Sequence, residues 1–150
     1  MAGGRHRRRD VVLSGTFAAA RLRTRPGLTR AAKVMILALI AGLAVGTATH
    51  VENLLRAGFR PRPELPLACN VFWSSLTIVD PLVALLLLAR PRTGVWVVLA
   101  LVALDLGVNI AVLGFIPPVL AQLGYGLLCL VAVPVVRRTP KQAYHDRTDR

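Results

Sequence analysis

The chain has 150 residues, of which 55% are apolar and 17% are charged, with 19 Lys and Arg against 7 Asp and Glu. This apolar fraction excludes an intrinsically disordered chain, which lacks the apolar residues needed for a core. The apolar residues fall in four long blocks and not in the short periodic patterns of a water-soluble domain, so the sequence predicts an integral membrane protein.

The four apolar blocks follow one another along the chain, and each is close to the roughly 20 residues that a helix needs to cross a bilayer. The predicted spans cover about residues 33–55, 70–89, 93–115 and 117–136, and Gly58 is a plausible stop for the first helix. A β-barrel is excluded because the blocks are too long and show no alternation of apolar and polar residues. The sequence therefore predicts an all-α polytopic membrane protein whose residues 31–136 form an antiparallel four-helix transmembrane bundle.

Two basic segments flank the predicted bundle. Residues 1–30 are interpreted as a cytoplasmic N-terminal extension that is disordered or lies on the membrane surface, and residues 137–150 as a cytoplasmic tail. The arginines at positions 8 and 9, before a short apolar run, leave a twin-arginine export signal as an alternative. Because residues 14–16 interrupt that run with small and polar side chains, the basic extension is favoured.

Lys and Arg are distributed unevenly between the two ends of the predicted bundle. Nine precede or begin the first span, two lie between the second and third spans, and five follow the last span. The opposite end has three, Arg56, Arg60 and Arg62. By the positive-inside rule, this places both termini in the cytoplasm and the protein in the cell membrane. The same charges predict contacts with anionic lipid at the cytoplasmic face of the lipid bilayer and argue against a nucleic-acid partner.

Polar residues inside the spans are the main indication of function. Asp80 and Asp105 both fall about 15 Å deep, near the bilayer midplane, where one charge costs roughly 2.5–3.5 kcal/mol. Two carboxyls at one depth without a basic partner should not both ionise, so one is expected to carry a proton or a cation to neutralise them. The other candidate ligand-binding or ion-binding residues are Asn109, His50, Glu52, Asn53, Trp73, Thr77, Gln122 and Tyr125.

Several of these candidates also have a purely structural interpretation. The side chains of Asn109, Gln122 and Thr77 are of the kind that holds transmembrane helices together, at about 0.6 kcal/mol for each hydrogen bond. His50 lies near enough to the membrane interface to be an ordinary solvated histidine, and Trp73 is typical of an aromatic belt. The two aspartates are the hardest to explain in this way.

Two features of the sequence concern helix geometry. Pro81 removes a backbone donor directly after Asp80, which predicts that the second span is kinked or broken near the midplane, as in proteins that bind solutes at interrupted helices. A simple proline kink is the alternative. Gly42 and Gly46 have the small-xxx-small spacing of closely packed helices, and Leu39 is expected to face lipid.

Four short segments resemble a family of small bacterial four-span membrane proteins. They are His50 to Asn53, Asn70 to Leu76, Asp80 to Leu82, and Asp105 with Asn109, and the resemblance covers about residues 33–136. It implies no assigned activity. The layout also distantly resembles the emopamil-binding and sterol isomerase superfamily, which places acidic residues and a histidine in a compact membrane bundle. No catalytic role follows for individual residues of this chain.

Three functions remain open from the sequence. The first is binding or moving a small solute or ion in an outward-opening cavity that ends at Asp80 and Asp105. The second is a membrane enzyme acting on a lipid or isoprenoid, with a carboxyl as general acid and its partner, or His50, as base. The third is a non-catalytic assembly factor whose polar groups pair and leave no cavity. Catalytic residues are not assigned, no metal or other cofactor is expected, and a homo-oligomer is compatible with the sequence.

The charge distribution generates a prediction about topology. In intact cells, a cysteine introduced by Arg62→Cys should react with a membrane-impermeant thiol reagent added outside, and one introduced by Arg92→Cys only after permeabilisation. Both variants would carry Cys69→Ser to remove the native thiol predicted near the outer end. The reverse labelling pattern would overturn the predicted orientation.

Overall fold

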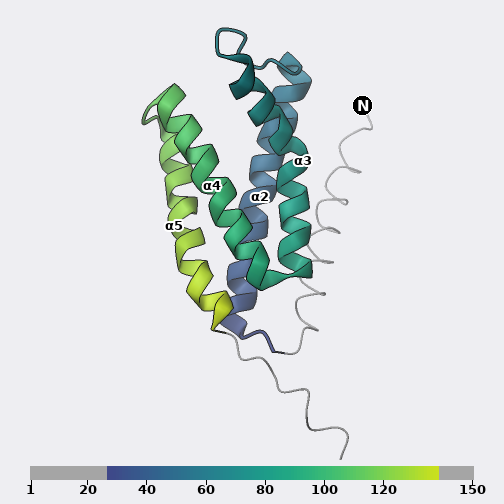
Figure 1. Ribbon diagram of the computed structural model, residues 1–150, viewed down its shortest axis with the longest axis vertical. Helices are drawn as coiled ribbons and strands as arrows, with labels where there is room; N and C mark the ends of the chain where they lie inside the picture. The colour runs from purple at the N-terminus through teal and green to yellow at the C-terminus, as the bar shows by residue number, and fades with distance from the viewer. Residues whose placement is uncertain (1–26, 139–150) are drawn as a thin grey trace, which may run out of the picture.

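The computed structural model describes residues 27–138, and most of these residues form four helices. They are α2 (Arg30–Ala57), α3 (Leu67–Ala89), α4 (Pro91–Leu113) and α5 (Pro117–Arg137) (Figure 1). Each helix is long and apolar enough to cross a membrane. Within the described residues the chain is all-α, which confirms the predicted four-helix bundle, and the protein is an integral membrane protein. The predicted N-terminal extension and C-terminal tail fall mostly outside the described residues.

The ends of the helices follow from local backbone and side-chain chemistry. The Thr29 hydroxyl accepts a hydrogen bond of 3.1 Å from the Ala32 amide, so α2 begins at Arg30, earlier than the predicted residue 33. Gly58 ends α2 with a φ of 70°, a left-handed conformation that glycine adopts without strain, and this confirms the predicted stop. Gly114 ends α4 with the same φ of 70°.

The four helices form a ring in which α2 and α4 each pack against both α3 and α5, and α2 and α4 also touch across the centre. Neighbouring helices are antiparallel because the connections are short, with Arg90 alone joining α3 to α4 and residues 114–116 joining α4 to α5. We call the end where α2 begins and α5 ends the terminal end. The end with residues 58–66 and 114–116 is the loop end, and the α2–α3 and α4–α5 pairs diverge toward it (Figure 1).

Apolar packing is concentrated in the half of the bundle nearest the terminal end. The core takes residues from the first halves of α2 and α4 and from the second halves of α3 and α5. Its members are Ala32, Ile36, Leu39, Leu43, Val83, Leu87, Val95, Val98, Val102, Cys129, Ala132, Val133 and Val136. Among the described residues, the buried polar side chains are Asn70 near the loop end and Asp80 in the middle of α3. The bundle is therefore apolar and closed at one end, and its polar groups lie toward the other.

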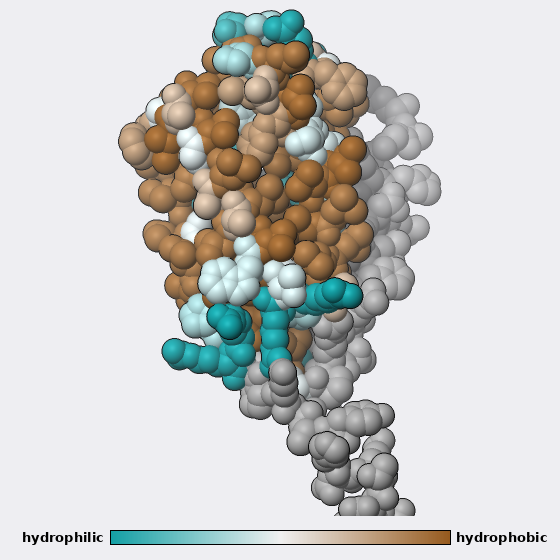
Figure 2. Space-filling model, in the orientation of Figure 1, coloured by the Kyte–Doolittle hydropathy of each residue, from teal (hydrophilic) through white to brown (hydrophobic). Residues whose placement is uncertain are grey.

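The outer surface of the bundle has a broad apolar belt between two hydrophilic ends (Figure 2). Every helix contributes exposed large apolar side chains, including Val45, Ile78, Leu104 and Leu127, each of which is more than half exposed. A surface of this extent would be unfavourable in water, whereas lipid chains can cover it in a bilayer. At the terminal end, the Arg137 guanidinium lies 5.6 Å from the centre of the Trp96 ring, a pairing suited to a membrane interface.

The structure overturns two expectations, a break in the second span and a lipid-facing Leu39. Helix α3 continues through Pro81 to Ala89, so the second span is not broken near its middle, and a kink at Pro81 stays a prediction. A membrane helix tolerates a missing backbone donor when neighbouring helices surround it. The sequence predicts Leu39 on the lipid-facing surface, but Leu39 is fully buried because it belongs to the apolar core between the helices. Tyr125 of α5 packs against the same core and donates its hydroxyl hydrogen to the Leu39 carbonyl at 2.6 Å.

Glycines allow close approach between neighbouring helices at three positions. A Cβ atom at Gly94 would lie 2.7 Å from the Cα of Leu87, and a Cβ at Gly42 would overlap the ring of Tyr125. At Gly46 it would lie 2.9 Å from a carboxyl oxygen of Asp80. Gly42 and Gly46 face neighbouring helices inside the bundle, as predicted, but side chains and not a backbone occupy the space beside them, whereas at Gly94 the backbone of α3 itself comes close.

We predict that Gly94→Ala lowers the free energy of unfolding by about 1–3 kcal/mol, because the backbone of α3 must move to admit the methyl group. The matched control is Gly107→Ala, since Gly107 has nothing within 4 Å of the new Cβ position. The control should gain up to about 1 kcal/mol, because alanine favours the helix more than glycine does. Thermal unfolding in a mild detergent compares the two variants. Equal melting temperatures would contradict the close contact between α3 and α4.

Candidate functional site

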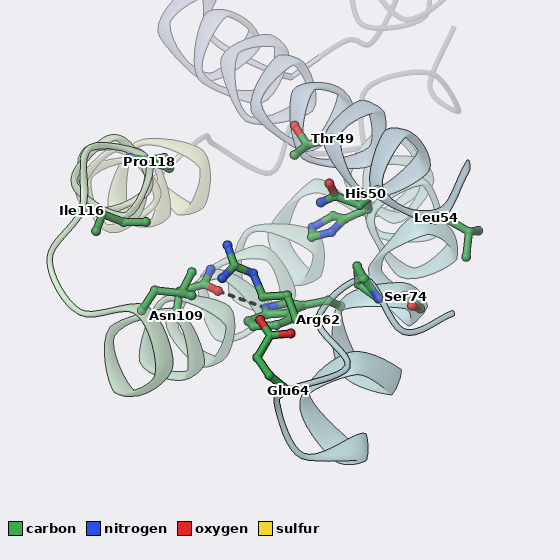
Figure 3. A pocket seen from close by; sticks show the side chains of 13 residues that line it. Thr49, His50, Leu54, Arg62, Glu64, Ser74, Asn109, Ile116 and Pro118 are labelled. Atoms are coloured by element: carbon green, nitrogen blue, oxygen red, sulfur yellow. Dashed lines mark hydrogen bonds between the residues drawn. The ribbon is translucent and has the colours of Figure 1, made fainter. Parts of the chain in front are cut away.

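A cavity of about 540 Å³ lies at the loop end, where all four helices contribute to its walls (Figure 3). The lining comes from α2 (Thr49, His50, Asn53 and Leu54), the α2–α3 connection (Pro61, Arg62 and Glu64), α3 (Trp73 and Ser74), and α4, α5 and the turn between them (Asn109, Leu113, Ile116 and Pro118). Two charged side chains, an imidazole and two amides share this lining with aliphatic groups. The cavity therefore offers hydrogen-bond donors, acceptors and both signs of charge to a molecule inside it.

One wall of the cavity is the α2–α3 connection, which Asn70 holds in place. Asn70 is fully buried near the start of α3, and its Oδ1 accepts a hydrogen bond of 2.9 Å from the Arg62 backbone amide. Its Nδ2 donates to the carbonyls of Arg62 at 2.8 Å and of Leu65 and Pro66 at 3.3 Å. Asn70 thus fixes the backbone of Arg62, and the guanidinium remains directed over the cavity (Figure 3).

Trp73 and Asn109 form the floor of the cavity, and both belong to a hydrogen-bonded network. The indole N–H of Trp73 donates to the side-chain carbonyl of Asn109 at 3.0 Å. The amide nitrogen of Asn109 donates to Asp105 at 3.2 Å and to the side-chain carbonyl of Gln122 at 2.8 Å. Gln122 completes the network by donating its own amide to the second carboxyl oxygen of Asp105. These four residues, which we call the Asp105 network, connect α3, α4 and α5.

The hydrogen bonds of the Asp105 network lead from the Trp73 indole through two amides to the Asp105 carboxyl group. Trp73 can only donate, the two amides both accept and donate, and each oxygen of Asp105 accepts one amide N–H. Hydrogen bonds to an ionised carboxylate are stronger than those between neutral groups, so this arrangement suits the charged form of Asp105. The spacing of Asp105 and Asn109, four residues apart on one helix, makes the contact between them predictable.

Asp80 has quite different surroundings. It is 6% exposed, and no N–H or O–H group of residues 27–138 donates to its carboxyl group. One of its oxygens faces the missing side chain of Gly46. Neither Asp80 nor Asp105 lines the cavity, whose floor is formed by Trp73 and Asn109. The expectation that the cavity ends at the two aspartates is therefore wrong, because the indole and the amide cover Asp105.

The remaining candidate residues divide between the cavity and the rest of the bundle. His50 and Asn53, three residues apart on α2, both line the cavity. Glu52 points away and forms an exposed ion pair of 2.7 Å with Arg56. The Thr77 hydroxyl is buried and has no hydrogen-bond partner in the described part of the chain. Tyr125 bonds to the backbone of α2 and takes no part in the cavity.

Four polar residues of the cavity, Thr49, Arg62, Glu64 and Ser74, are not among the residues predicted from the sequence. Arg62 and Glu64 lie in the α2–α3 connection, where the charge of Arg62 indicated topology only. The signal that could have found them is Asn70, an amide at the start of an apolar span directly after that connection. Ser74 bonds to the Phe59 carbonyl at 3.2 Å and so provides a second attachment for the connection.

The chemistry of the cavity favours non-covalent binding. Arg62 can donate to a carboxylate or phosphate, and within residues 27–138 no acidic side chain forms an ion pair with it. Glu64 can accept from an ammonium group, and Asn53 and Ser74 can bond to hydroxyl or carbonyl groups. Among the described residues, no group of three or more His, Cys, Asp and Glu side chains is arranged to hold a metal ion.

Comparisons of this chain with family models, curated proteins and solved structures gave no match. The resemblance to small bacterial four-span proteins therefore stays a prediction from the residues quoted above. The assignment of function depends on the cavity and its surroundings.

The Asp105 network generates a prediction about stability. Replacing Asn109 with leucine leaves the Trp73 N–H and the Gln122 carbonyl without partners, and we expect unfolding to become easier by about 1–3 kcal/mol. The control is Ser75→Ala, because the Ser75 hydroxyl bonds only to the Phe72 carbonyl in its own helix. Thermal unfolding and Trp73 emission, measured in a Trp96→Phe background, test this. Unchanged stability and emission in Asn109→Leu would mean that the network does not hold the helices.

Proposed function

We propose that this protein binds a small polar solute or ion in the cavity at its loop end. In this proposal the protein lies in the cell membrane with both termini in the cytoplasm, as the positive-inside rule indicates, and the cavity opens to the outside. The observation that carries the proposal is the cavity itself, which combines Arg62, Glu64, His50 and amide groups in a space of about 540 Å³. This volume lies within the range of small-molecule sites.

The shape of the bundle supports binding more than movement through the membrane. Trp73 and Asn109 form the floor of the cavity, and the half of the bundle beyond them is filled by the apolar core. A solute that enters from the loop end meets a closed structure halfway across. Transport would need a second arrangement of the helices, whereas binding needs only the arrangement described above.

The two alternative functions have less support. An assembly factor accounts for the Asp105 network, whose groups bond to one another, but it gives no reason for a cavity lined by Arg62, whose guanidinium forms no ion pair within residues 27–138. An enzyme that uses His50 together with an aspartate requires these groups in one site, and neither Asp80 nor Asp105 lines the cavity that His50 lines. Solute binding is the function that uses the cavity residues as they are placed.

The terminal end supports a second proposal, which concerns lipid. Arg30, Arg90, Arg92 and Arg137 lie at the ends of the helices there. Under the proposed orientation these cations face the cytoplasmic leaflet, where each basic residue near anionic lipid is worth about 1 kcal/mol. Anionic lipid is therefore the partner we propose at this end. A homo-oligomer stays a prediction.

Solute binding is tested by ligand-dependent stability of the full chain in nanodiscs. The probes are sodium, ammonium, acetate, phosphate and glycine, which present the charges and hydrogen-bonding groups that the cavity can complement. A probe at 100 times its Kd should raise the free energy of unfolding by about 2.7 kcal/mol. Asn53→Leu and Arg62→Leu should reduce this gain, because both side chains line the cavity.

The matched control is Glu52→Gln, which changes a neighbour of Asn53 that points away from the cavity. Loss of the exposed ion pair between Glu52 and Arg56 should cost at most about 1 kcal/mol and leave the response to probes unchanged. A stabilisation that persists in both cavity variants would place binding elsewhere. If none of the probes stabilises the wild-type protein, solute binding of this class is refuted.

A further inference from the structure

In the middle of α3, the carboxyl oxygens of Asp80 and the Thr77 hydroxyl have no hydrogen-bond partner in the described part of the chain. Asp80 is 6% exposed, and the Thr77 Oγ1 atom is sealed from solvent. Pro81 has no N–H group, so the Thr77 carbonyl also lacks the backbone donor that a regular helix would supply. Buried polar oxygens nearly always have a hydrogen-bond partner. The oxygens of Asp80 and Thr77 are an exception, which a bound proton or a bound ligand would explain.

The groups that face Asp80 from the other helices cannot supply a hydrogen bond or a positive charge. From α2 it meets Gly46, which has no side chain, and the next titratable residue on that face, His50, lines the cavity. From α5 it is within electrostatic reach of Tyr125, whose single hydroxyl proton is donated to the Leu39 carbonyl. From α4 it interacts with Asp105, a second carboxyl group.

Asp80 and Asp105 therefore differ in the hydrogen bonds that their carboxyl groups accept, and this difference decides which of them holds a shared proton. Both carboxyl oxygens of Asp105 accept amide hydrogen bonds, which stabilise a negative charge. Asp80 accepts none, and one charge near the middle of a bilayer costs roughly 2.5–3.5 kcal/mol. Two like charges within reach of each other would add to that cost.

We propose that Asp80 is a buried proton-binding site, occupied at neutral pH, while Asp105 is the ionised member of the pair. The proton bound at Asp80 reduces the charge of the pair from two negative charges to one. It is held apart from the cavity, because neither Asp80 nor Thr77 contributes to the cavity lining. The assignment is independent of solute binding, since it depends only on the surroundings of the two carboxyl groups.

Infrared spectroscopy of the full chain in nanodiscs tests this assignment without any ligand. A protonated carboxyl group has a C=O stretch that an ionised one lacks, and it shifts in D₂O. We expect this band in the wild-type protein at neutral pH. It should disappear in Asp80→Asn and persist in Asp105→Asn. Glu64→Gln is the control, because Glu64 is an exposed carboxyl group outside the helices and should not affect the band.

A second variant keeps the test informative if Asp80→Asn does not fold. Gly46→Ala places a methyl group about 2.9 Å from one oxygen of Asp80, and Asp80 is the only side chain within 4 Å of that position. The band should therefore change frequency in Gly46→Ala without being lost. A band that stays unchanged there, or that disappears in Asp105→Asn, would assign the proton to another group and overturn the proposal.

The same measurement separates a proton from a metal cation. With pH held constant, sodium or potassium chloride is added to the wild-type protein, and the band should remain, because the site is already occupied by a proton. If salt removes the band, Asp80 binds the cation in preference to the proton, and the proposal fails. Absence of the band in the wild-type protein at neutral pH would also refute it.

Discussion

A polar group inside a bilayer must find its hydrogen-bond partners within the protein, and this requirement organises the half of the bundle nearest the loop end. Asp105 meets it with amide groups from α4 and α5, and Trp73 brings in α3. The network connects three helices at the level where apolar packing ends. The network includes no side chain of α2, and the α2–α3 and α4–α5 pairs diverge toward the loop end (Figure 1), so the space beside His50 and Asn53 becomes the cavity.

The opposite half depends on close approach and not on hydrogen bonds between side chains. Gly42 accommodates the Tyr125 ring, Gly94 accommodates the backbone of α3, and aliphatic side chains fill the centre between the helices. Hydrogen bonding holds the helices together near the loop end, where the cavity lies, and apolar packing holds them together near the terminal end, where the core lies.

The sequence predicts the fold because the length and hydropathy of the spans are local properties. The contact between Asp105 and Asn109 is local as well, because it depends only on helical spacing. The placement of Arg62 beside the cavity depends on a buried bond between Asn70 and the connection, which no periodicity reveals. The difference between the surroundings of Asp80 and Asp105 also depends on tertiary contacts, because the sequence predicts the same depth in the bilayer for both residues. Leu39 is buried because it joins an apolar core to which all four helices contribute, and the hydropathy of a span does not show which of its faces meets that core.

Arg62 lies in a connection and not in a span, which keeps its charge out of the bilayer interior. A guanidinium group on a helix at mid-depth would cost several kcal/mol unless it were paired, and pairing would remove it from use. Arg62 avoids this cost because it lies at the loop end, where its charge can remain hydrated. Asn70 fixes the position of Arg62 through hydrogen bonds to its backbone amide at 2.9 Å and its backbone carbonyl at 2.8 Å. These bonds do not involve the guanidinium group. Asn70 itself can be buried because the backbone of the connection supplies hydrogen-bond partners for both ends of its side-chain amide.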